Sequence, residues 1–252
     1  MGELLQEIQL YWSGRAEGYS KVNQEELQGE QKDKWLSVLR EKFPHRRPEE
    51  LRVLDIGTGP GFFAVILAEQ GFQVTAVDYT QEMLQQAKRN AGIYAGAIDW
   101  YQMDAQNLEF ASEQFDVVVS RNLTWNLESP ERAYREWHRV LKKDGIMLNF
   151  DANWYGHLFD SQLRDAYEED RRQVENLDLE DHYTCTDTEW MEALARKMPL
   201  SPVTRPAWDY QILKETGFSR IQVEENVGER VWSLTERMNY ASTPMFCVAA
   251  YR

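Results

Sequence analysis

The chain is poor in cysteine. Cys185 and Cys247 are its two cysteines, too few for a disulfide framework, and neither has a partner at the spacing of metal ligands. We interpret both as reduced thiols. His182 lies close to Cys185 in the sequence, but one histidine and one cysteine do not make up a metal-binding set. We therefore predict no bound metal, and the sequence assigns no role to His182 or Cys185.

The chain also lacks an excess of positive charge and a long apolar run. Its 28 lysines and arginines stand against 42 aspartates and glutamates, a net charge of −14 at pH 7. Nucleic-acid affinity rests on clustered basic side chains, so this balance argues against a nucleic-acid partner and favours a neutral or basic small-molecule substrate. The longest apolar run, residues 62–68, is far shorter than the roughly 18–20 residues of a membrane span. With no secretory signal, we expect a cytoplasmic protein without a membrane partner, whose oligomeric state stays open.

What the chain does contain is enough apolar material for one packed domain. Its 252 residues are 42% hydrophobic and 12% aromatic. We predict four parts, namely a helical cap over residues 1–50, a core over 51–150, a helical lid inserted over 151–207, and a helix with strands over 208–252. Within the cap, the aromatic stretch from Tyr11 to Tyr19 is predicted to be a loop between two helices.

Strand-like and helix-like segments alternate from residue 51 onward. Short apolar runs such as Val117-Val118-Val119 are typical of buried strands, and each is separated from the next by a helical pattern. This alternation predicts a Rossmann-like, doubly wound α/β fold. We expect a seven-stranded, mostly parallel sheet whose last strand is antiparallel.

The chemistry-bearing residues lie where predicted strands end. The sequence VLDIGTGPG turns the first strand into the first helix, and its glycines allow the backbone to pass close under a ligand. Asp55 places a carboxylate beside this turn. Asp78 ends the second strand, where an acid can accept both ribose hydroxyls, and Asp104 ends the third, at the height of an adenine. Three carboxylates at three successive strand ends predict a nucleoside pocket.

The spacing of the glycines separates two classes of nucleoside-binding protein. Dinucleotide enzymes use Gly-x-Gly-x-x-Gly, because a pyrophosphate rests on the amino terminus of the helix. This chain has Gly-x-Gly-x-Gly with an acid two residues before it. Asp55 would repel a pyrophosphate but attract a ligand that carries an ammonium group.

These residues resemble the class I S-adenosylmethionine-dependent methyltransferases, especially the small-molecule branch with the ubiquinone and menaquinone methyltransferases. The resemblance runs from about residue 51 to residue 150. Its parts are VLDIGTGPG, Asp78 in VTAVDYT, Asp104 and Ala105 in QMDAQNL, FDVVVSRN, and REWHRVLKKDGIML. The segment YWSGRAEGY resembles the aromatic entry loop of the family. The resemblance implies S-adenosylmethionine as cofactor, S-adenosylhomocysteine as product, and residues 51–150 as the cofactor-binding core.

The resemblance also implies which residues bind the cofactor. Asp55 would reach the amino group of the methionine part, and the carbonyl of Ser120 or Arg121 would complete the ammonium site. Asp78 would hold the ribose. The methionine part would be lined by Gly57, Gly59 and Gly61. The adenine would be surrounded by Tyr79, Met83, Asp104 and Ala105. The residues closing over the cofactor would be Tyr11 and Tyr19.

The methyl acceptor is expected above the carboxyl ends of the fourth and fifth strands, under the lid. Methyl transfer mainly needs alignment and exclusion of water, and a base only when the acceptor must lose a proton. His157 is the candidate base, with a histidine packed at a helix start as the alternative. The candidate acceptor-binding residues are Asn122, Trp125, Asp151, Asn153, Trp154 and Tyr155. Trp154 and Tyr155 have packing within the lid as their alternative role.

The predicted function is methyl transfer from S-adenosylmethionine to a small-molecule acceptor by in-line displacement. One alternative is a regulatory protein that binds S-adenosylmethionine without turnover, and another is a protein or RNA methyltransferase. The sequence identifies neither the acceptor nor the acceptor atom, which is oxygen, nitrogen, sulfur or carbon.

Overall fold

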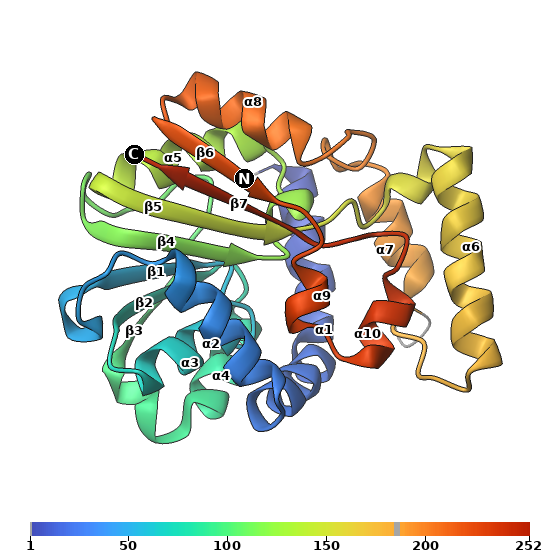
Figure 1. Ribbon diagram of the computed structural model, residues 1–252, viewed down its shortest axis with the longest axis horizontal. Coiled ribbons are helices and arrows are strands. Elements are labelled where there is room, and N and C mark those ends of the chain that lie inside the picture. Colours follow the sequence, from blue (N-terminus) through green and yellow to red (C-terminus); the bar gives the residue numbers. More distant parts are fainter. Residues whose placement is uncertain (1, 184–186) are drawn as a thin grey trace.

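The computed structural model of the chain describes residues 2–183 and 187–252. Its seven-stranded sheet has the order β3-β2-β1-β4-β5-β7-β6 (Figure 1). The strands are β1 (Arg52–Ile56), β2 (Gln73–Asp78), β3 (Ile98–Gln102), β4 (Phe115–Arg121), β5 (Leu141–Asp151), β6 (Arg220–Glu224) and β7 (Phe246–Tyr251). The first five strands pair in parallel, whereas β7 runs antiparallel to both β5 and β6. The predicted fold class is confirmed.

Helices cover both faces of the sheet, as Figure 1 shows. They are α1 (Glu3–Gln28), α2 (Gln31–Lys42), α3 (Phe62–Glu69), α4 (Gln81–Ala91), α5 (Pro130–Val140), α6 (Ser161–Asn176), α7 (Thr188–Ala195), α8 (Ala207–Thr216), α9 (Gly228–Val231) and α10 (Leu234–Asn239). Side chains of α2, α3 and α9 pack on one face of the sheet, and those of α5 and α8 pack on the other. Because both faces are covered, the middle of β4 is a run of consecutive apolar residues, and Val117, Val118 and Val119 are fully buried.

The amino-terminal segment differs from the prediction. Residues 11–19 belong to the continuous helix α1, so the predicted loop is wrong. Gly14 and Gly18 are exposed on this helix, where each costs about 1 kcal/mol relative to alanine. Packing of α1 along α4 offsets that cost, and the hydroxyl of Ser13 donates to Glu82 at 2.9 Å. Tertiary contact has therefore overridden the local propensity.

Residues 151–207, predicted to be a lid and called the lid below, contain the short helix η4 (Gly156–Leu158), α6, α7 and a proline-containing loop. Helix α6 lies at the far edge of the molecule from the sheet (Figure 1) and contacts η4 and α10. Helix α7 packs on α1, where Met191 and Leu194 join Ile8 and Tyr11 in one apolar cluster. The lid and the cap thus meet above the carboxyl ends of the strands.

The connection between β6 and β7 was also predicted incompletely. Within residues 208–252, predicted as a helix with strands, strand β6 ends at Glu224 and the two helices α9 and α10 follow it before β7. Asn226 has a φ of 58°, which ends the extended conformation. A capping box between Ser233 and Glu236 begins α10, and this Ser-x-x-Glu pattern was readable in the sequence.

Among the helices of the described residues, none combines the length and the apolar character needed to cross a membrane.

Candidate cofactor and acceptor site

A cavity lies at the carboxyl ends of the strands, between α1, the strand-end turns and the lid. Of the predicted cofactor residues, the cavity lining contains Tyr11, Tyr19, Asp55, Gly57, Gly59, Asp78, Tyr79, Met83, Asp104, Ala105 and Arg121. Of the predicted acceptor residues, it contains Asn122, Trp125, Trp154 and Tyr155. The predicted residues outside the lining are Gly61, Ser120, Asp151, Asn153 and His157. The fold therefore brings most of the predicted residues to one cavity.

Asp55 lies beneath the glycine turn, residues 57–61. Its carboxylate accepts a hydrogen bond from the Thr58 hydroxyl at 2.6 Å and another from the Ala64 amide at 3.1 Å. Burial raises the pKa of Asp55 to about 7, although these two hydrogen bonds work against the shift. A cationic ligand beside this carboxylate would favour its ionised form.

Asp78 joins the end of β2 to the glycine turn. One carboxylate oxygen accepts from the Gly59 amide at 2.8 Å, and the other accepts from the Thr80 amide at 2.8 Å. Burial raises the pKa of Asp78 to about 6. Because backbone groups hold both of its oxygens in place, the carboxylate is fixed in position before any ligand binds.

Asp104 follows β3 and is held in a similar way. Its Oδ1 accepts from the backbone amide of Gln106 at 2.9 Å and from the side-chain amide of Gln106 at 3.0 Å. Gln106 itself lines the cavity, although the sequence analysis did not select it. Its position two residues after Asp104 was the signal that could have identified it.

Arg121 contributes its side chain to the cavity at the end of β4. Its guanidinium makes a two-pronged ion pair with Glu26 of α1, with N···O distances of 2.7 and 2.9 Å. The guanidinium also lies 4.5 Å from the centre of the Phe62 ring. The ion pair with Glu26 joins the cap to the sheet and neutralises the charge of Arg121.

Two predicted cofactor residues support the cavity from outside its lining. Gly61 has a φ of 92°, and a Cβ at this position would lie 2.9 Å from the Cβ of Ala87 on α4. Its glycine is therefore required for close packing between the turn and α4. The Ser120 side chain is fully buried, and its hydroxyl donates to the carbonyl of Ile56 at 3.0 Å, which joins β4 to β1.

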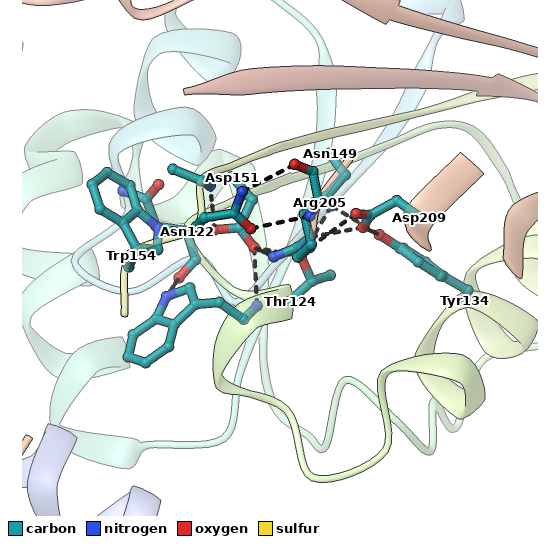
Figure 2. Close-up of polar contacts among 11 residues, drawn as sticks. Asn122, Thr124, Tyr134, Asn149, Asp151, Trp154, Arg205 and Asp209 are labelled. Atoms are coloured by element: carbon teal, nitrogen blue, oxygen red, sulfur yellow. Dashed lines mark hydrogen bonds and ion pairs between the residues drawn. The ribbon is translucent and has the colours of Figure 1, made fainter. Parts of the chain in front are cut away.

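Asp151 does not face the cavity, contrary to its predicted contact with the acceptor. It is fully buried at the end of β5 and accepts hydrogen bonds from the Trp125 amide and the Trp154 indole, both at 2.9 Å (Figure 2). A buried carboxylate keeps its charge only where donors surround it, and here the donors belong to the protein. Asp151 therefore positions two tryptophans that do line the cavity.

Arg205 lies between Asp151 and Asp209, as Figure 2 shows. Its Nη1 is 2.7 Å from Asp151, and its Nε and Nη2 are 2.9 and 2.7 Å from the two oxygens of Asp209. All three side chains are at most 1% exposed. The network is completed by the side chains of Thr124, Tyr134 and Asn149. We call these six residues the Arg205 network.

The Arg205 network also closes the lid at its base. Asn153, at the start of the lid, exchanges two hydrogen bonds with the backbone of Arg205, at 3.0 and 3.2 Å. This explains why Asn153 lies outside the cavity lining. Both ends of the lid are thus attached to the end of β5, and sequence patterns did not reveal this because the partners are more than 50 residues apart.

His157 is packed beneath α6. The side chain is buried and stacks on Tyr167, with ring centroids 4.1 Å apart and the planes 4° from parallel. Burial lowers its pKa to about 4. This position matches the alternative of a packed structural histidine, and a base here does not face the cavity.

Three further cavity residues come from distant segments. His182, Tyr183 and Tyr240 all line the cavity, and the Nδ1 of His182 lies 3.2 Å from the Tyr240 hydroxyl. Nothing in the local sequence marked the two tyrosines. Cys185 lies outside the described residues, whereas Cys247 is a free, buried cysteine.

A comparison with known protein families finds one match. A protein-family model described as a methyltransferase domain matches residues 54–149. The match runs from β1 into β5 and includes the glycine turn and all three strand-end aspartates. Residues 54–149 of this chain are therefore similar to a methyltransferase domain. The resemblance inferred from the sequence motifs is confirmed.

Several curated proteins align with this chain over more residues than the family model does. A Geobacillus protein (strain WCH70), classed by name among the methyltransferases, is 34% identical over 125 residues, or 48% of this chain and 50% of the relative. A Neonectria protein named an S-adenosyl-L-methionine-dependent Diels-Alderase is 27% identical over 187 residues, or 73% of this chain and 64% of the relative. The chain spans about half the length of the first curated relatives it matches.

Solved structures share the fold of the methyltransferase domain. Phosphoethanolamine N-methyltransferase 2 of Haemonchus contortus, in complex with S-adenosyl-L-methionine, has a TM-score of 0.59 at 20% identity. The likeness covers 86% of this chain and 51% of that one. At this identity the likeness supports the fold alone.

Proposed function

We propose that this chain transfers a methyl group from S-adenosylmethionine to a small-molecule acceptor. The observation that carries the proposal is the placement of Asp55, Asp78 and Asp104 around one glycine turn in one cavity. Asp55 would attract the ammonium of the methionine part, and Asp78 would accept the ribose hydroxyls. Asp104 would meet the amino group of an adenine held between Tyr79 and Met83.

The protein's part in the reaction would be alignment. The sulfonium of the cofactor is itself a strongly activated leaving group, so the acceptor atom needs to lie in line with the methyl–sulfur bond while water is excluded. Helix α1 and the lid enclose the cavity from the side opposite the sheet, which suits that task. No ionised base from the lid is needed for an acceptor that is already nucleophilic.

Turnover with labelled cofactor tests the proposal. Purified protein incubated with methyl-labelled S-adenosylmethionine and an extract of its source cells is expected to place label in the small-molecule fraction. Label in the macromolecular fraction would instead support a protein or RNA methyltransferase. Binding of S-adenosylhomocysteine without any transferred label would support a role in which the cofactor is bound but not consumed, and the Neonectria relative makes this the second candidate.

Cofactor binding is expected to weaken as the pH falls from 8 to 5.5. The pKa values of Asp55 and Asp78 are raised to about 7 and about 6, so both carboxylates become protonated over this interval and lose their attraction for the ammonium and the ribose. We expect the Kd for S-adenosylhomocysteine to rise about tenfold, measured by calorimetry. In Asp55→Asn, the part of this rise centred near pH 7 should vanish; an unchanged profile would contradict the role of Asp55.

The stability of the free protein should change in the opposite direction. A carboxyl whose pKa is higher in the folded state than its ordinary value near 3.8 contributes stability that is complete below that value. This contribution is lost as the pH rises through the folded pKa. Asp55 and Asp78 therefore contribute more to the free energy of unfolding of the ligand-free protein at pH 5.5 than at pH 8. Cofactor binding, in contrast, is stronger at pH 8.

A further inference from the structure

The acceptor side of the cavity is lined by rings. We call Trp125, Trp154, Tyr155, Tyr183 and Tyr240 the aromatic wall, and all five line the cavity. Trp125 and Tyr155 have ring centroids 5.0 Å apart, Trp154 and Tyr240 are 5.3 Å apart, and Tyr183 and Tyr240 are 5.8 Å apart. The rings of the wall therefore form two contacting groups, Trp125 with Tyr155 and Trp154 with Tyr240 and Tyr183, and the tyrosines add hydroxyl groups.

The aspartates and arginines that line the cavity lie on the cofactor side, whereas His182 lies beside the aromatic wall, with its Nδ1 3.2 Å from the Tyr240 hydroxyl. Among the described lining residues, the aspartates and arginines are Arg15, Asp55, Asp78, Asp104 and Arg121, and no lysine or glutamate occurs. Asp55 and Asp78 lie at the ends of β1 and β2, Asp104 follows β3, and Arg121 is neutralised by Glu26. Arg15 lies one turn of α1 before Tyr19, whose ring lies 3.6 Å from where a Cβ on Gly59 would be. These charges thus gather around the glycine turn.

The ion pair of Asp151 and Arg205 is buried next to the aromatic wall. Asp151 and Arg205 are at most 1% exposed and pair with each other at 2.7 Å. Asp151 is bonded to Trp125 and Trp154, so these two tryptophans stand between the ion pair and the cavity. The charges of the Arg205 network are therefore satisfied within the protein and are unavailable to a ligand.

The remaining polar groups of the acceptor side suit neutral partners. Burial raises the pKa of the Tyr155 and Tyr183 hydroxyls, so both stay protonated at neutral pH. Such hydroxyls can donate and accept hydrogen bonds but cannot balance a full charge. An ionised ligand group placed among them would lose its hydration without gaining a counter-ion, which is costly.

We propose that the methyl acceptor is an uncharged, ring-bearing small molecule, and that the aromatic wall selects it against anions and cations of the same shape. This inference rests on the proposed function, because it assigns the substrate class of the same cavity. Among the described residues that line the acceptor side, anions meet no lysine or arginine, and the one basic side chain there, His182, already contacts the Tyr240 hydroxyl at 3.2 Å. Cationic ligands are the more demanding test of this selectivity, because aromatic ring faces attract cations even where no carboxylate is present.

Three probes with the same ring system test the proposal. We would titrate 1-naphthol, 1-naphthoate and 1-naphthylmethylammonium into the protein saturated with S-adenosylhomocysteine, using calorimetry at pH 7.5. We expect 1-naphthol to bind at least about tenfold more tightly than either ion. Preferential binding of the ammonium or of the carboxylate would overturn the proposal, and so would absence of 1-naphthol binding.

Variants locate the binding. Trp125→Ala is expected to weaken 1-naphthol binding at least about tenfold, while Trp100→Ala, on β3 outside the described cavity lining, should not change it. Retained binding of S-adenosylhomocysteine shows that each variant is folded. A preference for 1-naphthoate that disappears in Arg15→Ala would overturn the proposal by revealing an anion site. Failure of the wild-type protein to bind S-adenosylhomocysteine at all would refute the proposed function instead, so the two failures are distinguishable.

Discussion

Arg205→Met is expected to lower the free energy of unfolding by about 3–5 kcal/mol, the cost of leaving a buried charge without its partner. Asp151 and Asp209 are both fully buried and share this one guanidinium. Without it, both buried carboxylates lose the cation that neutralises them. Urea unfolding followed by circular dichroism would measure the loss.

An exposed ion pair provides the matched control. Arg172 pairs with Glu169 at 2.7 Å on the surface of α6, where both side chains are at least half exposed. Because water solvates each charge when the partner is removed, Arg172→Met should leave the unfolding midpoint close to that of the wild type. A similar loss in both variants, or a negligible loss in Arg205→Met, would show that the Arg205 network does not stabilise the fold as its burial implies.

Asp78→Ala is expected to weaken binding of S-adenosylhomocysteine by about 1.5–3 kcal/mol, the usual loss for hydrogen bonds to a charged group. The substitution removes the proposed acceptor of the ribose hydroxyls. It also releases the amides of Gly59 and Thr80, which the carboxylate holds at 2.8 Å. Calorimetry on the purified variant measures the change in Kd directly.

Two companion variants separate these effects. Asp78→Asn keeps the size of the side chain and one acceptor oxygen, so its loss should be smaller than that of Asp78→Ala. Asp99→Ala changes an exposed aspartate of β3 outside the described cavity lining and should bind as the wild type does. Wild-type affinity in Asp78→Ala would remove Asp78 from the cofactor site.

The cofactor side of the site was predictable because its signals are local. Asp55, Asp78 and Asp104 each lie at or just after the end of a strand whose apolar pattern is readable, and a parallel sheet brings such ends to one edge. The glycine turn adds a backbone requirement, since Gly57, Gly59 and Gly61 all have positive φ. The spacing of apolar residues, the residue types in the turn and the order of the strands were therefore sufficient to predict the cofactor side of the site.

The acceptor side was less predictable because its contacts join distant segments. Asp151 and His157 follow a buried strand just as the cofactor aspartates do, yet their partners lie elsewhere in the chain: Arg205 is 54 residues after Asp151. Tyr240 reaches the cavity from the position directly after α10, a helix that was not predicted from the sequence. Residue type and sequence neighbourhood do not reveal such pairings.

The sequence by itself determined the layered α/β sheet, the glycine turn and the three strand-end carboxylates, because periodicity and turn geometry act over a few residues. The tertiary structure decided that residues 11–19 are helical, since packing on α4 outweighs two glycines. It also decided which polar residues face the cavity. The physical reason is burial. Asp151 is stable in the interior because Arg205 neutralises its charge there, and Trp125 and Trp154, which are bonded to Asp151, line the cavity.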